Sequence, residues 1–99
     1  MRNILPVYII GFIFLLAFND SDPTGMITGK VTNSEGKPVV KRVVGAGGEY
    51  DFTDLKGNYR LDKVPYGTHI LAVVSKGDTL RQIRVHVDTT HLHINISLP

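Results

Sequence analysis

Short turn signals recur along the chain, and their regular spacing constrains the fold more than any other feature. Asn33 and Asp54 each begin a four-residue segment that ends in glycine, at Gly36 and Gly57. In such a turn the short polar side chain caps the following backbone, and glycine accepts the left-handed conformation at the exit. The six predicted turns begin at residues 33, 45, 54, 64, 75 and 88. Spacings of 9 to 13 residues are close to the roughly 8 to 12 expected of a small antiparallel β-sandwich.

The runs between these turns have the period of β-strands. Residues 91–98 alternate strictly, with polar side chains on one face and aliphatic side chains on the other, and residues 83–87 repeat the pattern. Residues 68–75 are apolar on nearly both faces, as expected of a central strand. No run has a helical period, so the sequence predicts an all-β, seven-stranded antiparallel sandwich.

The N-terminal residues differ from the rest of the chain. Arg2 precedes an apolar run of fifteen residues, 4–18, that contains no charge. This run is shorter than the roughly 20 residues of a comfortable membrane span, and a basic start before such a run is typical of a secretory signal. We interpret residues 1–21 as a signal peptide or, because no small-x-small cleavage pattern follows, an uncleaved anchor. Residues 22–25 are then a linker, and residues 26–99 are the folded domain.

The cysteine and charge content limit the location and the partners. The chain has no cysteine, which excludes lipid attachment of the bacterial lipoprotein type and disulfide staples. Export without disulfides suggests a protein of the bacterial envelope. Beyond residue 21 the chain has ten Lys or Arg (all except Arg2) and eight Asp or Glu (all except Asp20), a net charge of +2. These charges are interleaved, whereas a nucleic-acid surface requires clustering, so no nucleic-acid partner is expected.

Four short motifs follow one another in a characteristic order. They are a G-x-V strand, a turn ending in G-x-P, the segment T-D-x-x-G-x-Y and a V-P-x-G turn. The matching positions are Gly29, Val31, Gly36, Pro38, Thr53, Asp54, Gly57, Tyr59, Val64, Pro65 and Gly67. Together they resemble the carboxypeptidase regulatory-like domain, over about residues 27–98 of the chain.

This resemblance implies a seven-stranded Greek-key sandwich of the prealbumin-like or immunoglobulin-like kind, without catalytic residues of its own. Such domains lie beside peptidases and at the N-terminus of TonB-dependent receptors in the outer membrane of Bacteroidetes-type bacteria. The family often has small residues where this chain has Lys41 and Arg42, which predicts a second strand that is distorted or displaced towards a sheet edge. Because no peptidase, plug or barrel follows Pro99, we expect a free-standing module or a fragment of a larger receptor or peptidase. The expected location is the periplasm or cell surface of a Gram-negative bacterium.

The polar segment over residues 52–69 is interpreted as turns and strand faces, not as an active site. Its Asp, Gly and Pro residues are turn residues, and Tyr59, Leu61 and Val64 are predicted to pack inward. No pair of its polar groups has a spacing that predicts a general acid and base, and no G-x-S-x-G elbow or cysteine nucleophile is present. Residues 45–48, GAGG, have neither the spacing nor the following helix of a phosphate loop. The chain is therefore predicted not to be an enzyme and to need no cofactor.

Three histidines form the candidate metal site. A hairpin between the last two predicted strands would pair Val87 with Leu92. This register would place all three on the solvent side, close enough to share a Zn²⁺ or Cu²⁺ ion: His86, His91 and His93. The alternative is that they only fill polar positions on an outer face. We favour this alternative, and predict no metal, because structural zinc sites normally have four protein ligands.

The aromatic residues bear on the choice between a protein and a glycan partner. Tyr50 and Tyr66 are expected on exposed loops and are the candidate glycan contacts. The chain has no tryptophan, and a sugar platform normally requires broad aromatic faces, so a protein partner is preferred. A small core and unclosed sheet edges favour docking by an edge or a loop end onto a larger envelope protein. The predicted function is protein interaction or structural support, with glycan or divalent-metal binding as the alternative.

Overall fold

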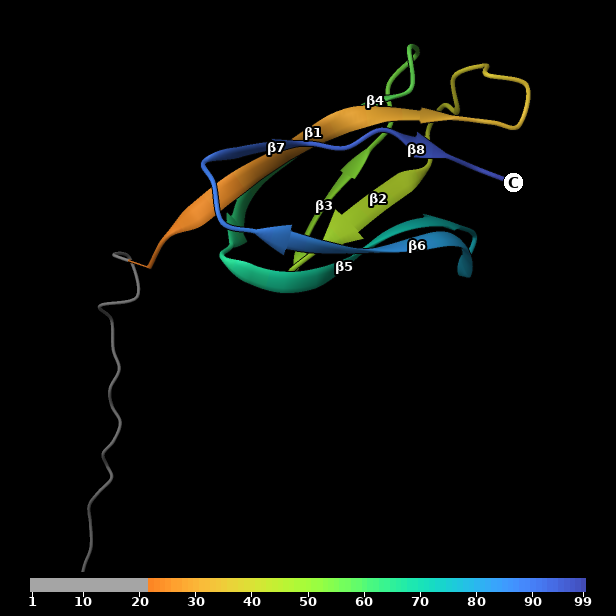
Figure 1. Cartoon of the computed structure of the whole chain (residues 1–99). Coiled ribbons are helices and arrows are strands. Elements are labelled where there is room, and N and C mark those ends of the chain that lie inside the picture. The colour runs from red at the N-terminus through yellow and green to blue at the C-terminus, as the bar shows by residue number, and fades with distance from the viewer. Residues whose placement is uncertain (1–21) are drawn as a thin grey trace, which may run out of the picture.

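Residues 22–99 form two β-sheets packed face to face, with no helix, in a computed structural model of the chain (Figure 1). The signal peptide or anchor predicted over residues 1–21 lies outside the described residues. Residues 22–99 contain no helix long and apolar enough to cross a membrane. The strands are β1 (Thr24–Thr32), β2 (Val43–Ala46), β3 (Glu49–Phe52), β4 (Asn58–Pro65), β5 (Gly67–Ser75), β6 (Asp78–Val87), β7 (His91–His93) and β8 (Ile96–Ser97). The predicted all-β sandwich is thereby confirmed.

Each sheet combines strands that are distant in the sequence. The first sheet has the order β4-β1-β7, with β8 also paired to β1, and the second has the order β3-β2-β5-β6. The chain changes sheets between β1 and β2, β3 and β4, β4 and β5, and β6 and β7. Consecutive strands therefore often face each other across the core instead of pairing.

Both hairpins of the second sheet close with two-residue turns. Gly47 and Gly48 have φ angles of 60° and 87° between β2 and β3, and Lys76 and Gly77 have φ angles of 52° and 86° between β5 and β6. Positive φ at both positions matches the right-handed twist of the flanking strands. The GAGG segment is therefore the end of β2 and a hairpin turn.

The second predicted strand is interrupted. Lys41 has a φ angle of 57°, and β2 begins only at Val43. Thr53, which is 2% exposed, holds this irregular segment because its Oγ1 accepts a bond from the Arg42 N–H at 2.9 Å. The predicted distortion is confirmed. The predicted displacement towards an edge is wrong, because β2 lies between β3 and β5.

The C-terminal run differs from the prediction in two ways. It is divided into β7 and β8, so the sandwich has eight strands rather than seven, and both strands pair in parallel with β1. The predicted hairpin with the preceding strand is wrong, because residues 88–90 carry the chain from β6 to the other sheet. Between β7 and β8, the Asn95 Oδ1 atom accepts a bond from the Lys30 N–H at 3.0 Å.

The predicted linker is shorter than residues 22–25. β1 begins at Thr24, which pairs with Pro65, and Gly25 is buried opposite Val64. The backbone of Pro23 also accepts a hydrogen bond from the Tyr66 N–H at 3.2 Å. Thr24 and Gly25 thus belong to the folded domain.

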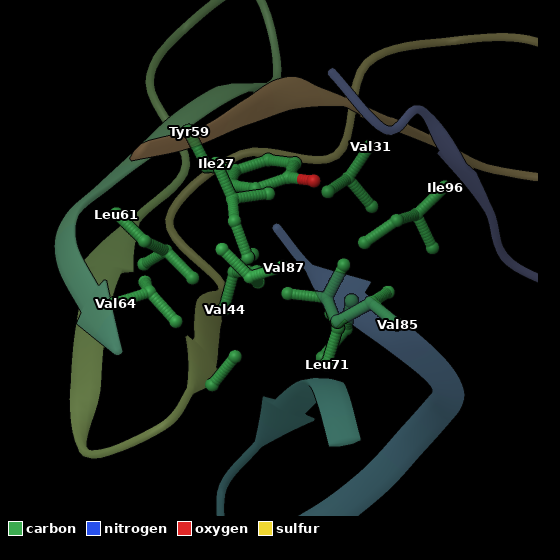
Figure 2. Packing of buried hydrophobic residues seen from close by; sticks show 12 residues of the cluster. Ile27, Val31, Val44, Tyr59, Leu61, Val64, Leu71, Val85, Val87 and Ile96 are labelled. Atoms are coloured by element: carbon green, nitrogen blue, oxygen red, sulfur yellow. The ribbon is translucent and has the colours of Figure 1, made fainter. Parts of the chain in front are cut away.

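The core lies between the two sheets and consists almost entirely of aliphatic side chains (Figure 2). Tyr59, Leu61 and Val64 are 3%, 1% and 0% exposed, which confirms their predicted inward orientation. A fully buried aliphatic side chain contributes about 1.5 to 3 kcal/mol of transfer free energy. The fully buried side chains are Ile27, Val31, Val44, Leu61, Val64, Leu71, Val73, Val87 and Ile96.

Candidate functional site

The two Asx-type turns of the motif have the same geometry. Asp54 Oδ1 accepts bonds from the backbone N–H groups of Lys56 and Asn58, both at 2.9 Å. Gly57 then adopts a φ of 81°. The hydrogen bonds from Asn58 and Lys56, the first being the larger cause, lower the pKa of Asp54 below its ordinary value. The Asn33 turn uses its amide oxygen in the same way.

Gly29 and Tyr59 allow the C-terminal segment to pack closely against β1. The Tyr59 hydroxyl donates a hydrogen bond to the Ile94 carbonyl at 2.6 Å, and the Ile94 N–H donates to the Thr28 carbonyl at 2.8 Å. A Cβ atom at Gly29 would overlap the Ile94 carbonyl oxygen. Burial raises the pKa of Tyr59 well above its ordinary value of 10.0. Both motif residues therefore fix the chain path.

The remaining motif residues are also structural. A Cβ atom at Gly57 would lie 2.6 Å from the Val31 carbonyl oxygen and 3.1 Å from the Pro38 ring, so glycine allows this close packing. The Pro65 carbonyl accepts a bond from His69 Nε2 at 2.7 Å. Gly67 has a φ of 127° at the turn into β5. Val31 is fully buried, Thr53 holds Arg42, and Gly36 has a φ of 81° in the Asn33 turn.

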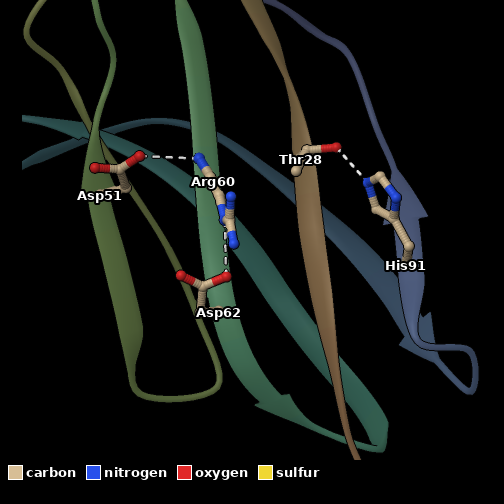
Figure 3. Close-up of polar contacts among 5 residues, drawn as sticks. All are labelled: Thr28, Asp51, Arg60, Asp62 and His91. Atoms are coloured by element: carbon tan, nitrogen blue, oxygen red, sulfur yellow. Dashed lines mark hydrogen bonds and ion pairs between the residues drawn. The ribbon is translucent and has the colours of Figure 1, made fainter.

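The outer face of the first sheet is polar, and Figure 3 shows part of it. Arg60 Nε donates to Asp62 Oδ1 at 2.9 Å, in an ion pair whose side chains are 65% and 57% exposed. Such an exposed pair contributes at most about 1 kcal/mol. Asp51, which comes from edge strand β3, accepts the Arg60 backbone N–H at 2.9 Å on its Oδ2 atom. One edge of β4 pairs with β1. Asp51 therefore satisfies a backbone N–H group on the other, outer edge of β4.

The three candidate metal ligands are divided between the two sheets. His91 and His93 lie on β7. One nitrogen of each ring faces Thr28 Oγ1 of β1: His91 Nε2 at 2.7 Å and His93 Nδ1 at 3.1 Å. His86 lies on β6 in the second sheet, paired with Thr68. The register that would bring all three together is therefore wrong. Among residues 22–99, no three His, Cys, Asp or Glu side chains are grouped to hold a metal ion.

The outer face of the second sheet carries exposed apolar side chains. Tyr50 is 65% exposed, Phe52 59% and Ile70 48%. The register places smaller residues between the two aromatic residues and Ile70: Val43 and Gly45 on β2, and Ala72 and Val74 on β5. We call these seven residues the aromatic face. The other exposed large apolar side chains within residues 22–99, Leu55 and Tyr66, lie in turns.

One expectation about the aromatic residues requires correction. Tyr50 lies on strand β3 and not on a loop, because the two-residue glycine turn lets β3 begin at Glu49. Its ring adjoins that of Phe52, with centroids 6.1 Å apart. Tyr66, as expected, is exposed (38%) and lies in the turn between β4 and β5. Phe52 and Ile70 were not candidates, although alternation in the segment EYDF indicates that Tyr50 and Phe52 share a face.

The fold and these surfaces define an all-β sandwich with one polar and one apolar outer face. No protein-family model matches the chain, and no curated protein matches its sequence. The resemblance to the carboxypeptidase regulatory-like domain thus stays a prediction based on the motif residues.

Proposed function

We propose that this chain is an exported, non-catalytic β-sandwich module that binds a protein partner in the bacterial envelope. The observation that carries the proposal is the aromatic face, on which Tyr50, Phe52 and Ile70 are 65%, 59% and 48% exposed. Contiguous apolar surface of this kind is typical of interaction sites, whereas isolated exposed apolar residues are ordinary. Tyrosine and phenylalanine are also enriched at the centres of protein interfaces.

The border of the aromatic face favours a partner with acidic residues around an apolar centre. On β6, Gln82, Arg84 and His86 lie opposite Ala72, Ile70 and Thr68 of β5. Arg84 is thus directly beside Ile70 and contributes a positive charge at the rim. Rim charges of complementary sign steer association and select partners.

The geometry of the two rings favours a protein over a glycan. The planes of Tyr50 and Phe52 are inclined at 53°. A sugar chain stacks best on rings that present one broad surface, whereas inclined rings suit interdigitation with apolar side chains. Glycan binding through Tyr50 and Tyr66 is the second candidate, supported by the exposure of both side chains.

Affinity capture with the full-length chain tests the docking proposal. The double variant Tyr50→Ser and Phe52→Thr removes both rings from β3 without removing its backbone. Leu55→Ser is the matched control, because Leu55 is 79% exposed but lies in the turn between β3 and β4. We expect a discrete envelope protein to bind the wild type and Leu55→Ser and to be lost with the double variant. Equal capture by all three proteins would contradict the proposal.

Hydrogen exchange separates docking by the face from docking by an edge. The second sheet ends at β6, whose outer edge pairs with no strand among residues 22–99. Addition of a partner strand there would protect amides of β6. Binding through the aromatic face would leave the exchange rates of these amides unchanged. It would instead alter the NMR signals of the Tyr50 and Ile70 side chains.

The export and family proposals rest on the sequence. The apolar run over residues 4–18 and the carboxypeptidase regulatory-like motifs support a module located in the periplasm or at the cell surface, with a TonB-dependent receptor or a peptidase as the expected kind of neighbour. Mass spectrometry of the chain recovered from the envelope tests export and cleavage together. A product that begins near Asp22 is expected, and a chain retained in the cytoplasm would contradict export.

A further inference from the structure

The face of the first sheet contains two imidazole rings that converge on one atom. His91 and His93 are alternate residues of β7, so both point to the solvent side of the sheet. His91 Nε2 lies 2.7 Å and His93 Nδ1 lies 3.1 Å from Thr28 Oγ1. Figure 3 shows the His91 ring directed at the Thr28 hydroxyl. We call His91 and His93 the histidine pair.

The hydrogen-bond chemistry of the histidine pair leaves ring nitrogens that a metal can use. A neutral imidazole has one N–H and one unprotonated nitrogen, and the Thr28 hydroxyl has a single proton to donate. At most one ring can accept that proton, so at least one ring donates its N–H to Thr28 Oγ1. A change of tautomer in each donating ring places two unprotonated nitrogens on the same side of the sheet.

We propose that the histidine pair binds one Cu²⁺ ion, with water completing the coordination. Imidazole nitrogens are good ligands for late first-row metals, and Cu²⁺ binds a given nitrogen site most tightly among the divalent ions of this row. Water has to fill the other positions, because residues 22–99 hold no group of three His, Cys, Asp or Glu side chains at metal-binding distance. Both rings are exposed, so small rotations can bring their nitrogens to bonding distance.

The second sheet provides a matched control for this site. His86 Nδ1 lies 3.1 Å from Thr68 Oγ1, so β5 and β6 carry the same histidine–threonine bond with only one ring. A single exposed imidazole lacks the chelating partner that holds the ion in the histidine pair. His86 is therefore expected to contribute nothing to copper binding.

Copper titration of the full-length chain without a polyhistidine tag tests the proposal. Calorimetry gives the stoichiometry and affinity, and electron paramagnetic resonance reports the nitrogen ligands of bound Cu²⁺. We expect one ion per wild-type chain with two nitrogen ligands, and at least a tenfold loss of affinity in His91→Gln and in His93→Gln. His86→Gln should bind as the wild type does.

Two results would overturn the site. One is wild-type affinity in both His91→Gln and His93→Gln, which would place the copper elsewhere in the chain. The other is a spectrum of the wild-type complex without two imidazole nitrogens. Thermal unfolding of each metal-free variant verifies that the exposed substitutions leave the fold intact, so that loss of affinity reports on the site itself.

Discussion

The Tyr59 side chain links β4 and the core to the C-terminal segment. Its ring is 3% exposed in the core, and its hydroxyl donates to the Ile94 carbonyl at 2.6 Å. The same carbonyl lies against Gly29, where any side chain would overlap it. The glycine and the tyrosine of the motif are therefore required together, because one allows the C-terminal segment to approach β1 and the other holds it there.

Tyr59→Phe removes only this hydroxyl. We expect a loss of about 1 to 2 kcal/mol in the free energy of unfolding, because the Ile94 carbonyl loses its buried donor. The wild type should also lose stability as the pH rises above about 10, since the phenol then ionises in the unfolded chain but stays protonated in the fold. Urea unfolding from pH 7 to 11 measures both effects. The alkaline loss should be smaller in Tyr59→Phe, and identical pH dependence in the two proteins would contradict the role of the buried hydroxyl.

Asp54 makes its turn dependent on pH, whereas Asn33 does not. The lowered pKa of Asp54 means that the turn stabilises the fold above the ordinary pKa of 3.8 and loses this contribution as the pH falls through the lower folded value. Asp54→Asn should keep both backbone hydrogen bonds, as Asn33 does, and remove the acid dependence. Asp54→Ala should lower the melting temperature at neutral pH. Acid unfolding curves of the three proteins check this, and a variant Asp54→Asn with the wild-type acid profile would refute it.

At the scale of elements, Asp51 protects the edge where β3 and β4 adjoin. Its carboxylate accepts both the Phe52 and the Arg60 backbone N–H groups, at 2.8 and 2.9 Å. An inward-pointing charge on an edge strand discourages pairing with another chain. Asp51→Ala should therefore increase self-association, measured by sedimentation velocity over a concentration series. Asp62→Ala is the control, since Asp62 pairs only with the exposed Arg60 side chain; a monomer in both variants would contradict this role.

On strand β5, two adjacent residues have different expected roles, one in stability and the other in binding. Leu71 is fully buried and Ile70 is 48% exposed on the aromatic face. Leu71→Ala should cost about 2 to 5 kcal/mol of unfolding free energy because it leaves a cavity. Ile70→Ala should change stability by less than about 1 kcal/mol, as is usual for exposed positions, but weaken capture of the partner. Denaturant unfolding and affinity capture of both variants provide the measurements. Unchanged capture by folded Ile70→Ala would remove Ile70 from the binding surface.

At the scale of the whole molecule, the local sequence pattern predicts the fold class well but does not predict which distant strands pair. Turn residues and alternation give the sandwich class and the inward side of β4. The destination of β7 could not be predicted, because Leu92 can face the core from either sheet with the same alternation. The bonds that decide it, from the Ile94 N–H to the Thr28 carbonyl and from the Lys30 N–H to Asn95 Oδ1, join residues far apart in the sequence.

The histidine pair and the aromatic face could not be predicted from the sequence for the same reason. Sequence spacing places His91 and His93 on one face, but only the pairing of β7 with β1 brings Thr28 between them. The aromatic face likewise depends on the order β3-β2-β5-β6, which sets Tyr50 and Phe52 beside residues of β2 and, beyond them, β5. Neither sheet order nor register follows from alternation alone.

Photocrosslinking in intact cells tests whether the aromatic face binds a protein partner. A photoreactive phenylalanine analogue is placed in turn at the positions of Phe52, Ile70 and Leu55. We expect one common crosslinked product from Phe52 and Ile70 and none from Leu55, although Leu55 is the most exposed of the three. The same product from Leu55, or none from Phe52 and Ile70, would contradict it.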